Sequence, residues 1–152
     1  MKEKNKKIVL FIVMCLFTLF ALLVALKLYS NKKQNDLSVS KIDSYLTEIK
    51  YEEINSYVLE QPKIIIYVSN SSENTSLTFE KNFINVVKKH NLENDVIYIN
   101  INGTNQVDPV YQNAPELVIY KDGTITDVIN CDTLKSETDI VNSLTERGII
   151  ND

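Results

Sequence analysis

Side chains that act as nucleophiles or metal ligands are scarce in this chain of 152 residues. It contains two cysteines, Cys15 and Cys131, and a single histidine, His90. Two thiols so far apart exclude a disulfide-rich scaffold and a structural zinc site of the usual four-ligand kind. The 20 acidic residues are scattered without the spacing of metal ligands. We therefore expect neither a metal site nor a cofactor.

Two parts of the sequence still offer side chains that could bind a ligand or react. The polar segment SNSSENTS, residues 69–76, offers hydroxyls, amides and the N–H groups of a helix start to a ligand; alternatively, Ser72, Asn74 or Thr75 caps that helix. Cys131 is the only thiol outside a long apolar run. It is either a reactive thiol or a small apolar side chain packed beside a strand, which is the commoner use of a lone cysteine. We favour capping and packing.

The average composition, 44% hydrophobic with a net charge of −4, combines two different segments. The run from Ile8 to Leu26 holds 18 apolar residues among 19, with Thr18 as the exception. A helix rises about 1.5 Å per residue, so about 20 such residues cross a bilayer core. Residues 8–29 are therefore predicted to be a transmembrane anchor. The alternative, a cleavable signal peptide, has a shorter apolar core and is followed by a pair of small residues that this chain lacks.

Charge predicts the orientation of this anchor and excludes one class of partner. Lysines flank the span on both sides: Lys2, Lys4, Lys6 and Lys7 before it, and Lys27, Lys32 and Lys33 after it. This slight bias predicts a cytoplasmic tail at residues 1–7 and an extracytoplasmic domain, held at the cell membrane by a single pass. From residue 30 onward, 11 basic and 19 acidic residues give a net charge of −8. Such a domain is not expected to bind nucleic acid through its net field.

The remaining chain is predicted to be a linker, residues 30–40, and one domain, residues 41–152. The linker is polar and lacks periodicity, and the three glycines and three prolines fall mostly where elements end. Strands are predicted at residues 45–50, 63–69, 95–102, 115–121 and 124–131. Helices are predicted at residues 51–60, around the face marked by Phe79, Phe83, Val86, Val87 and His90, and from Ser136 to Gly148.

The connections between these elements predict a mixed sheet. Strands joined through a helix run parallel, whereas the Asp122-Gly123 turn joins an antiparallel hairpin. Ser136, with Asp139 three residues later, has the spacing of a capping box. The order is β-α-β-α-β, a short link, and then β-β-α. It predicts an α/β domain of three layers.

Two segments carry a family resemblance that spans residues 44–150. The segment NAPELVIYKDG, Asn113 to Gly123, is similar to one in which a cis-proline opens the fourth strand and a Lys-x-Gly hairpin ends it. The segment KIIIYVS leads into a polar loop and an amphipathic helix, where the same family places its active site. The domain thus resembles the thioredoxin-like family, with the third helix reduced to one turn at residues 108–111. As an anchored whole, the chain is similar to the bacteriocin-transport accessory proteins of Gram-positive bacteria.

The resemblance also implies that the redox site is degenerate. It places the two active-site cysteines of the family on Ser72 and Thr75, so the motif here is Ser72-Glu73-Asn74-Thr75. A hydroxyl forms no disulfide, and its pKa lies far above that of a thiol. The buried acid of the family falls on Ile66, and its helix-kinking proline falls near Glu80. We therefore expect no catalytic residue and no redox activity.

The function predicted from these observations is a non-catalytic accessory module of the cell envelope or of peptide export. In the resembling family, the backbone beside the cis-proline pairs with an extended chain, which implies a protein- or peptide-binding site at Ala114 and Pro115. The plain alternative is that Pro115 only ends the preceding loop. Two other functions stay open: a thiol oxidoreductase that uses Cys131, and a structural scaffold that assembles through membrane helix and domain.

Overall fold

The computed structural model describes residues 2–38, 41–105 and 107–151, and among the first 40 residues it describes the side chains of Val9 and residues 11–29. Residues 1, 39–40 and 152, which belong to the predicted tail, linker and domain, lie outside the described residues. The chain forms two compact units, Met1–Leu37 and Ser38–Asp152.

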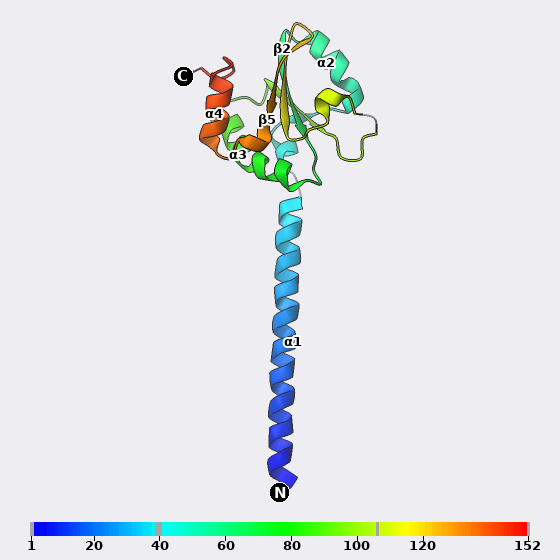
Figure 1. The fold of residues 1–152 in the computed structure, drawn as a ribbon, viewed down its shortest axis with the longest axis vertical. Helices are drawn as coiled ribbons and strands as arrows, with labels where there is room; N and C mark the ends of the chain where they lie inside the picture. Colours follow the sequence, from blue (N-terminus) through cyan, green and yellow to red (C-terminus); the bar gives the residue numbers. More distant parts are fainter. Residues whose placement is uncertain (1, 39–40, 106, 152) are drawn as a thin grey trace. The chain divides into compact units, whose positions relative to one another are not determined.

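The first unit is a single helix, α1, Lys2–Ser38 (Figure 1). Within it, Phe11–Tyr29 is long enough and apolar enough to cross a membrane. Large apolar side chains point outward all along this part, as in Phe17, which is 74% exposed. The helix continues through residues 30–38, where we expected irregular chain. Residues 30–38 are polar and have no apolar periodicity, so that pattern does not reveal that they continue the helix.

The second unit is built on a five-stranded mixed sheet, as predicted. Its strands are β1, Thr47–Glu48; β2, Lys63–Ser69; β3, Val96–Asn100; β4, Glu116–Lys121; and β5, Thr124–Asn130. They lie in the order β1-β3-β2-β4-β5. β2 is parallel to β3 and β3 to β1, whereas β4 is antiparallel to both β2 and β5. The first strand is shorter than predicted because only Thr47 and Glu48 pair with β3.

Helices cover both faces of the sheet and complete the three layers. The α-helices are α2, Ile54–Glu60; α3, Asn74–His90; and α4, Glu137–Thr145. Short 3₁₀ turns are η1, Ile42–Ser44; η2, Tyr51–Glu53; η3, Pro109–Tyr111; and η4, Cys131–Thr133. Figure 1 shows α3 and α4 on one side of the strands and α2 on the other. The single turn η3 stands where the resemblance predicted a reduced third helix.

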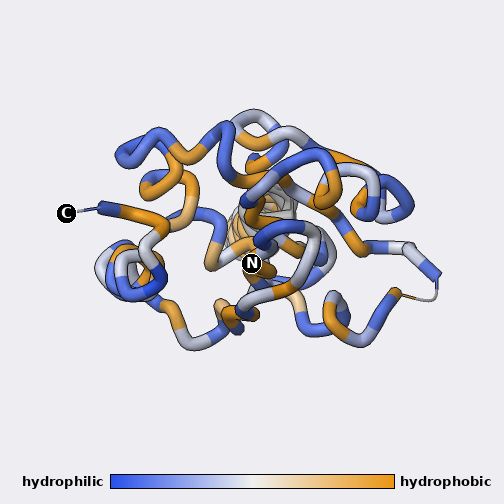
Figure 2. Tube along the Cα trace, turned by 90° about the horizontal axis from the view of Figure 1, so that it is seen from above, coloured by the Kyte–Doolittle hydropathy of each residue, from blue (hydrophilic) through white to orange (hydrophobic). Residues whose placement is uncertain are grey.

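The side chains of β2 divide the core into two clusters. Ile65 and Tyr67 pack with residues of α3 and α4, whereas Ile64, Ile66 and Val68 pack with residues of α2 and η3. Successive strand residues face opposite sides, so a strand covered on both sides must be apolar throughout. The helices have one apolar stripe each, and Figure 2 shows the resulting alternation of hydrophobic and hydrophilic segments along the chain.

Local signals define the turn between β4 and β5 and the start of α4. Asp122 and Gly123 have φ angles of 49° and 74°, which is the backbone that the predicted two-residue turn requires. Ser136 Oγ accepts a hydrogen bond from Asp139 N, and Asp139 Oδ2 accepts one from Ser136 N, which confirms the predicted capping box. α4 ends at Thr145, three residues before the predicted Gly148.

Candidate functional site

The loop before α3 is organised by Asn70. Its Oδ1 accepts hydrogen bonds from Ser72 N at 3.2 Å and Ser72 Oγ at 2.7 Å, and its Nδ2 donates to Glu73 Oε1 at 2.7 Å. The N-cap residue of α3 is Glu73, and no side chain makes the capping hydrogen bond. The prediction that Ser72, Asn74 or Thr75 caps this helix is therefore wrong, because Asn70 holds Ser72 in a local turn instead.

A second set of hydrogen bonds fixes this loop to the end of β3. Ser71 N donates to Asn100 Oδ1 at 3.3 Å, and Asn100 Nδ2 donates to Ser71 Oγ at 3.0 Å. Asn102 Nδ2 reaches the same Ser71 Oγ at 3.3 Å. These amides and hydroxyls position the start of α3. The hydroxyl of Ser72 meets an amide oxygen, which is not a base, so its bond does not generate a nucleophile.

Pro115, directly before β4, and Cys131, directly after β5 at the start of η4, lie next to each other. The Ala114–Pro115 bond is cis, as the resemblance implied, and Cys131 N donates to Pro115 O at 2.9 Å. Cys131 is 1% exposed, with its Sγ 3.5 Å from Ile129 O. Burial raises the pKa of this thiol, and the carboxylates of Glu116 and Asp132 raise it further. Cys131 therefore stays protonated at neutral pH and packs as an apolar side chain.

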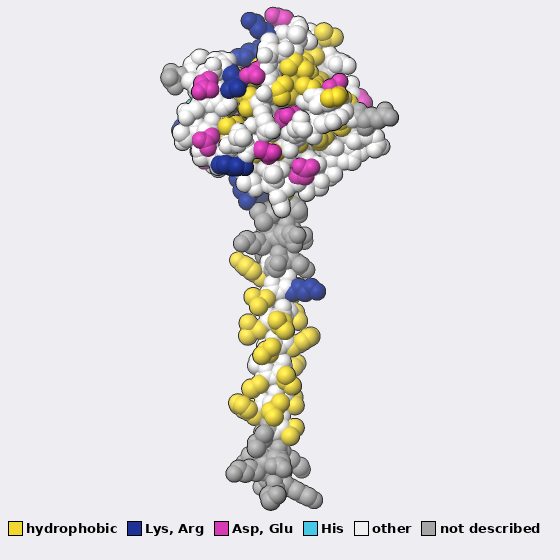
Figure 3. Space-filling view, viewed as in Figure 1, with side chains coloured by type: hydrophobic (Ala, Val, Ile, Leu, Met, Phe, Trp, Pro, Cys, Tyr) yellow, Lys and Arg dark blue, Asp and Glu magenta, His cyan; other side chains and the backbone are white. Residues whose placement is uncertain are grey.

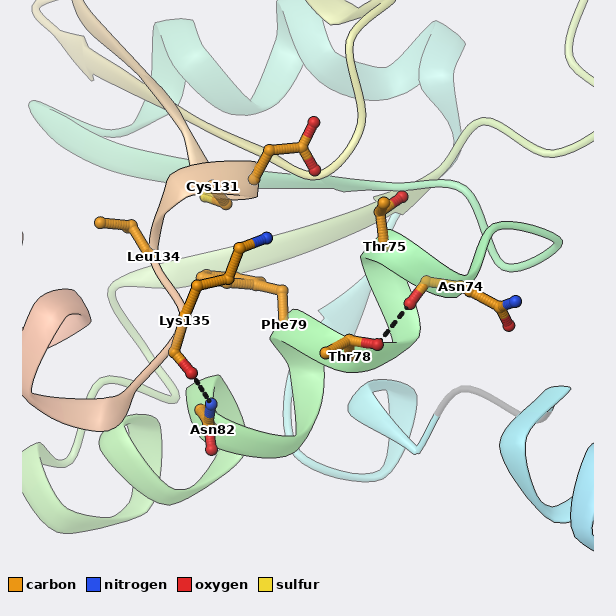
Figure 4. Close-up of a pocket in the computed structure, with 9 residues that line it drawn as sticks. Asn74, Thr75, Thr78, Phe79, Asn82, Cys131, Leu134 and Lys135 are labelled. Atoms are coloured by element: carbon orange, nitrogen blue, oxygen red, sulfur yellow. Dashed lines mark hydrogen bonds between the residues drawn. The ribbon is translucent and has the colours of Figure 1, made fainter.

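A pocket of about 180 Å³ joins the start of α3 to η4. Its lining comes from two segments: Asn74, Thr75, Thr78, Phe79 and Asn82 on α3, and Cys131, Asp132, Leu134 and Lys135 after β5. Figure 4 shows Thr75 across this space from Cys131, with the ring of Phe79 between α3 and Lys135. The rim is held by two hydrogen bonds, from Thr78 Oγ1 to Asn74 O and from Asn82 Nδ2 to Lys135 O (Figure 4).

The structure therefore brings together some of the predicted site residues and separates others. Thr75 and Cys131 share the pocket, and Asn74 lines its edge, whereas Ser72 and Glu73 do not contribute to it. Ala114 packs against the apolar cluster on the α2 side of the sheet. Among the described residues, no backbone hydrogen bond involves the N–H or the C=O of Ala114.

Two buried carboxylates near this site were not predicted. Glu80 is 2% exposed and accepts hydrogen bonds from Ser69 Oγ at 2.7 Å and Tyr67 Oη at 3.2 Å. The sequence contains one indication that Glu80 is buried. Glu80 lies on the same face of the helix as Phe79 and Phe83, and a glutamate buried on that face needs a hydrogen-bond partner.

Glu116, directly after Pro115, is 4% exposed, and its Oε2 has no hydrogen-bond partner within the described chain. Burial raises the pKa of this carboxyl, hydrogen bonds from Asn113 offset part of the effect, and Asp132 adds to it. The sequence indicates this burial only through the position of Glu116, an acidic residue at the start of an otherwise apolar strand.

Comparison with solved structures identifies the fold. Mitochondrial thioredoxin 3 from Saccharomyces cerevisiae matches 68% of this chain and 96% of its own, with a TM-score of 0.52 and 10% sequence identity. Thioredoxin f2 from Chlamydomonas reinhardtii matches 70% of this chain and 99% of its own, with a TM-score of 0.54 and 9% identity. The domain has the thioredoxin fold. At such low identity the likeness establishes fold alone.

Comparisons of sequence find nothing further. No protein-family model matches this chain, and no curated protein matches it. The similarity to bacteriocin-transport accessory proteins thus stays a prediction. Within the described residues, no group of three or more His, Cys, Asp or Glu side chains is arranged to hold a metal ion.

Proposed function

We propose that this thioredoxin-fold domain is a membrane-anchored module that binds an extended segment of a protein or peptide, without redox chemistry. The observation that carries the proposal is the pocket between Thr75 and Cys131, beside Pro115 and at the start of α3. It lies where the resembling family places its dithiol, and here hydroxyls and a buried thiol line it. The partner is a component of the cell envelope or of a peptide-export system.

The local geometry favours recognition of an extended chain. The N–H and C=O of Ala114 are available to pair with the backbone of a peptide. The neighbouring pocket has the size of one large side chain, since cavities of about 150 Å³ accommodate a benzene ring. Phe79, Leu134 and Cys131 give it an apolar lining, with Asp132 and Lys135 of opposite charge at the rim. An uncharged aliphatic or aromatic side chain therefore suits it best.

Peptide binding is tested with the full-length chain in lipid nanodiscs and short synthetic peptides that carry Leu, Phe, Asp or Lys at the centre. We expect the Leu and Phe peptides to bind. Thr75→Trp should fill the pocket and weaken their binding by about tenfold, the loss of roughly one buried apolar side chain. The matched control is Thr138→Trp on the exposed face of α4. Absence of binding by every peptide, or equal binding by T75W, would contradict the proposal.

The redox alternative uses Cys131 and is tested by insulin reduction in the presence of dithiothreitol. The buried, protonated Cys131 and the hydroxyls at positions 72 and 75 favour a rate equal to that of dithiothreitol alone. The control is Cys131→Ser. A rate above background that disappears in C131S would establish the oxidoreductase function in place of ours.

Anchoring and orientation are supported by the apolar span and by the basic tail before it. Phe11–Tyr29 has the length of a transmembrane helix. With the tail in the cytoplasm, protease added to spheroplasts should remove the domain and leave a short membrane-embedded fragment. A domain that survives until the membrane is lysed would reverse the orientation. If chemical crosslinking in cells captured only stable membrane neighbours and no extended peptide, the scaffold alternative would replace the binding module.

A further inference from the structure

The outer strand β5 has a free edge, because β4 is its only neighbour in the sheet among the described residues. Cys131 N donates to Pro115 O at 2.9 Å, and this pair continues the register in which Glu116 faces Asn130. In an antiparallel ladder, residues whose backbone groups point to the neighbouring strand alternate with residues whose groups point away from it. The N–H and C=O groups of Val128 and Asn130 therefore point to the free edge.

Two of these four outward groups already have partners within the domain. Val128 N donates to Asp127 Oδ1 at 2.8 Å, and Asn130 O accepts a hydrogen bond from Thr133 Oγ1 at 3.3 Å. The other two, Val128 O and Asn130 N, have no hydrogen-bond partner within the described chain. They place one acceptor and one donor on either side of Ile129. An extended chain beside this edge satisfies both at once, with one N–H and one C=O of its own backbone.

The edge borders a groove that has room for such a chain. The groove has a volume of about 510 Å³ and lies between β5 and α4. Val128, Ile129 and Asn130 line it on the strand, and residues such as Asn142 and Glu146 line it on the helix. A cavity of about 150 Å³ accommodates a benzene ring, so this groove holds more than a single side chain.

The side chains around the groove indicate which bound chain would suit it. Arg147 Nε donates to Asp127 Oδ2, so these opposite charges neutralise each other. On the side of the domain where Figure 1 shows α4, acidic and basic side chains lie near one another on the surface (Figure 3). The α4 side of the groove is polar at Asn142 and Glu146, whereas Val128, 38% exposed, is an apolar side chain on the α2 side of the sheet. A strand with polar side chains toward α4 and apolar ones beside Val128 therefore fits.

We propose that β5 binds an extended segment of a partner protein, which joins the sheet as an additional strand centred opposite Ile129. The backbone supplies one hydrogen bond to Val128 O and accepts one from Asn130 N, and alternate polar and β-branched side chains match the two faces. A second copy of this chain fits less well. Two-fold pairing of β5 with β5 keeps both α4 helices on the same face, where each would meet the other in the groove and oppose Glu146 to Glu146.

This site is separate from the Thr75–Cys131 pocket of the proposed function. Leu134 is the one residue that lines both. The two proposals can therefore fail independently. Thr75→Trp should leave strand binding at β5 unchanged, and Asn130→Pro should leave binding of the Leu and Phe peptides at the pocket unchanged.

The test uses the full-length chain in nanodiscs and the peptide Lys-Thr-Val-Thr-Val-Thr-Lys, capped at both ends and carrying a fluorescent label. Binding is followed by fluorescence anisotropy, and the amide signal of Asn130 is followed by NMR. Two matched peptides carry a methyl group on the backbone nitrogen of the central threonine or of the valine after it. A parallel strand donates to Val128 O from the first of these nitrogens and an antiparallel strand from the second. We expect the unmodified peptide to shift the Asn130 amide signal, and one methylated peptide to bind about fivefold more weakly, the loss of one hydrogen bond.

A pair of variants tests the donor on the protein. Asn130→Pro removes the outward N–H; the φ of −74° at this position suits proline, and the hydrogen bonds to β4 do not use this N–H. Asn130→Ala is the matched control, because it also loses the bond that Asn130 Oδ1 accepts from Asp132 N but keeps the backbone N–H. With equal far-ultraviolet circular dichroism, N130P should bind the peptide about fivefold more weakly than N130A.

Four results would overturn the proposal. The first is an Asn130 amide signal that does not move with the unmodified peptide. The second is equal binding by all three peptides, or by N130P and N130A, because the contact would then not use the backbone. The third is a loss of binding in T75W, which would place this peptide in the pocket. The last is a concentration-dependent shift of the Asn130 signal without peptide, because the occupant would then be a second copy of the chain.

Discussion

Glu80 and Glu116 are both buried in the domain, but their surroundings differ. Glu80 receives hydrogen bonds from Ser69 and Tyr67, on the strand that faces it. Glu116 keeps one oxygen without a partner in the described chain, and burial raises its pKa. A buried polar group costs free energy unless it is hydrogen-bonded. The two residues should therefore have opposite effects on stability.

Replacing Glu80 should be strongly destabilising. Glu80→Ala removes the acceptor of two buried hydroxyls, each of which then costs about 1–3 kcal/mol, and it also opens a cavity. Glu80→Gln retains an acceptor oxygen and should lose less than half as much. The chain has eight tyrosines and no tryptophan, so urea unfolding is followed by tyrosine fluorescence. Equal losses for E80A and E80Q would show that the hydrogen bonds to Ser69 and Tyr67 contribute little.

Replacing Glu116 should change how stability depends on pH. A carboxyl whose pKa is raised by folding binds more protons in the folded than in the unfolded chain, so the free energy of unfolding falls as pH rises from the unfolded pKa through the folded one. Glu116→Gln carries no ionisable group and loses this dependence. The difference in unfolding free energy between E116Q and the unmodified chain should therefore shift toward E116Q as the pH rises above the usual carboxyl pKa of about 4. A difference that is constant with pH would contradict the raised pKa.

At the level of elements, the starts of α3 and α4 differ in how they are capped. α4 has the reciprocal Ser136–Asp139 capping box, whereas α3 begins at Asn74, after the N-cap residue Glu73, without a side-chain cap. Ser136→Ala should cost about 1 kcal/mol, measured by urea unfolding. It should also bring the lowered pKa of Asp139 back toward its usual value, because Ser136 is the main cause of that shift.

The variant Thr75→Ala at the start of α3 provides the comparison, since Thr75 makes no capping bond. It should cost clearly less than Ser136→Ala. A loss in T75A as large as that in S136A would show that Thr75 contributes to the helix start in solution.

The sequence predicts an element correctly where its pattern of apolar residues shows which side chains are buried. The run KIIIYVS gives β2 to the residue because a strand covered on both faces must be apolar throughout. The prediction fails at residues 30–38, which continue α1 without apolar periodicity, and at the start of α3. In the second case Ser72, Asn74 and Thr75 are all good capping residues, and the outcome depends on the bond from Ser72 to Asn70, which composition does not reveal.

The same difference between local sequence patterns and particular contacts applies to the candidate site. Pro115 and the positions of Ser72 and Thr75 are predicted from the resemblance, because each lies in a recognisable segment. The pocket depends on η4, which brings Cys131 toward Thr75, and nothing in the local sequence predicts that approach. Glu80 stands among polar residues of α3, and its partners Ser69 and Tyr67 are 11 and 13 residues away. Glu116 opens an apolar strand, and its burial depends on packing that the local sequence does not show.

At the scale of the whole molecule, the chain joins two units of different composition. The apolar residues of α1 are exposed along Phe11–Tyr29, whereas the domain buries two apolar clusters under a polar, acidic surface. Phe11–Tyr29 has the length and the apolar composition of a helix that crosses a membrane. The composition average of 44% hydrophobic residues therefore describes neither unit.

Detergent phase separation tests this division directly. The full chain should enter the detergent-rich phase of Triton X-114, and a shortened chain, residues 41–152, should stay in the aqueous phase with the far-ultraviolet circular dichroism of a mixed α/β fold. In the full chain, Leu16→Arg combined with Leu23→Arg should lower membrane retention, because an arginine near the middle of a membrane helix costs about 3 kcal/mol. Conservative Leu16→Ile and Leu23→Ile changes are the matched control. Retention of the double arginine variant at the level of that control would mean that the domain itself holds the protein at the membrane.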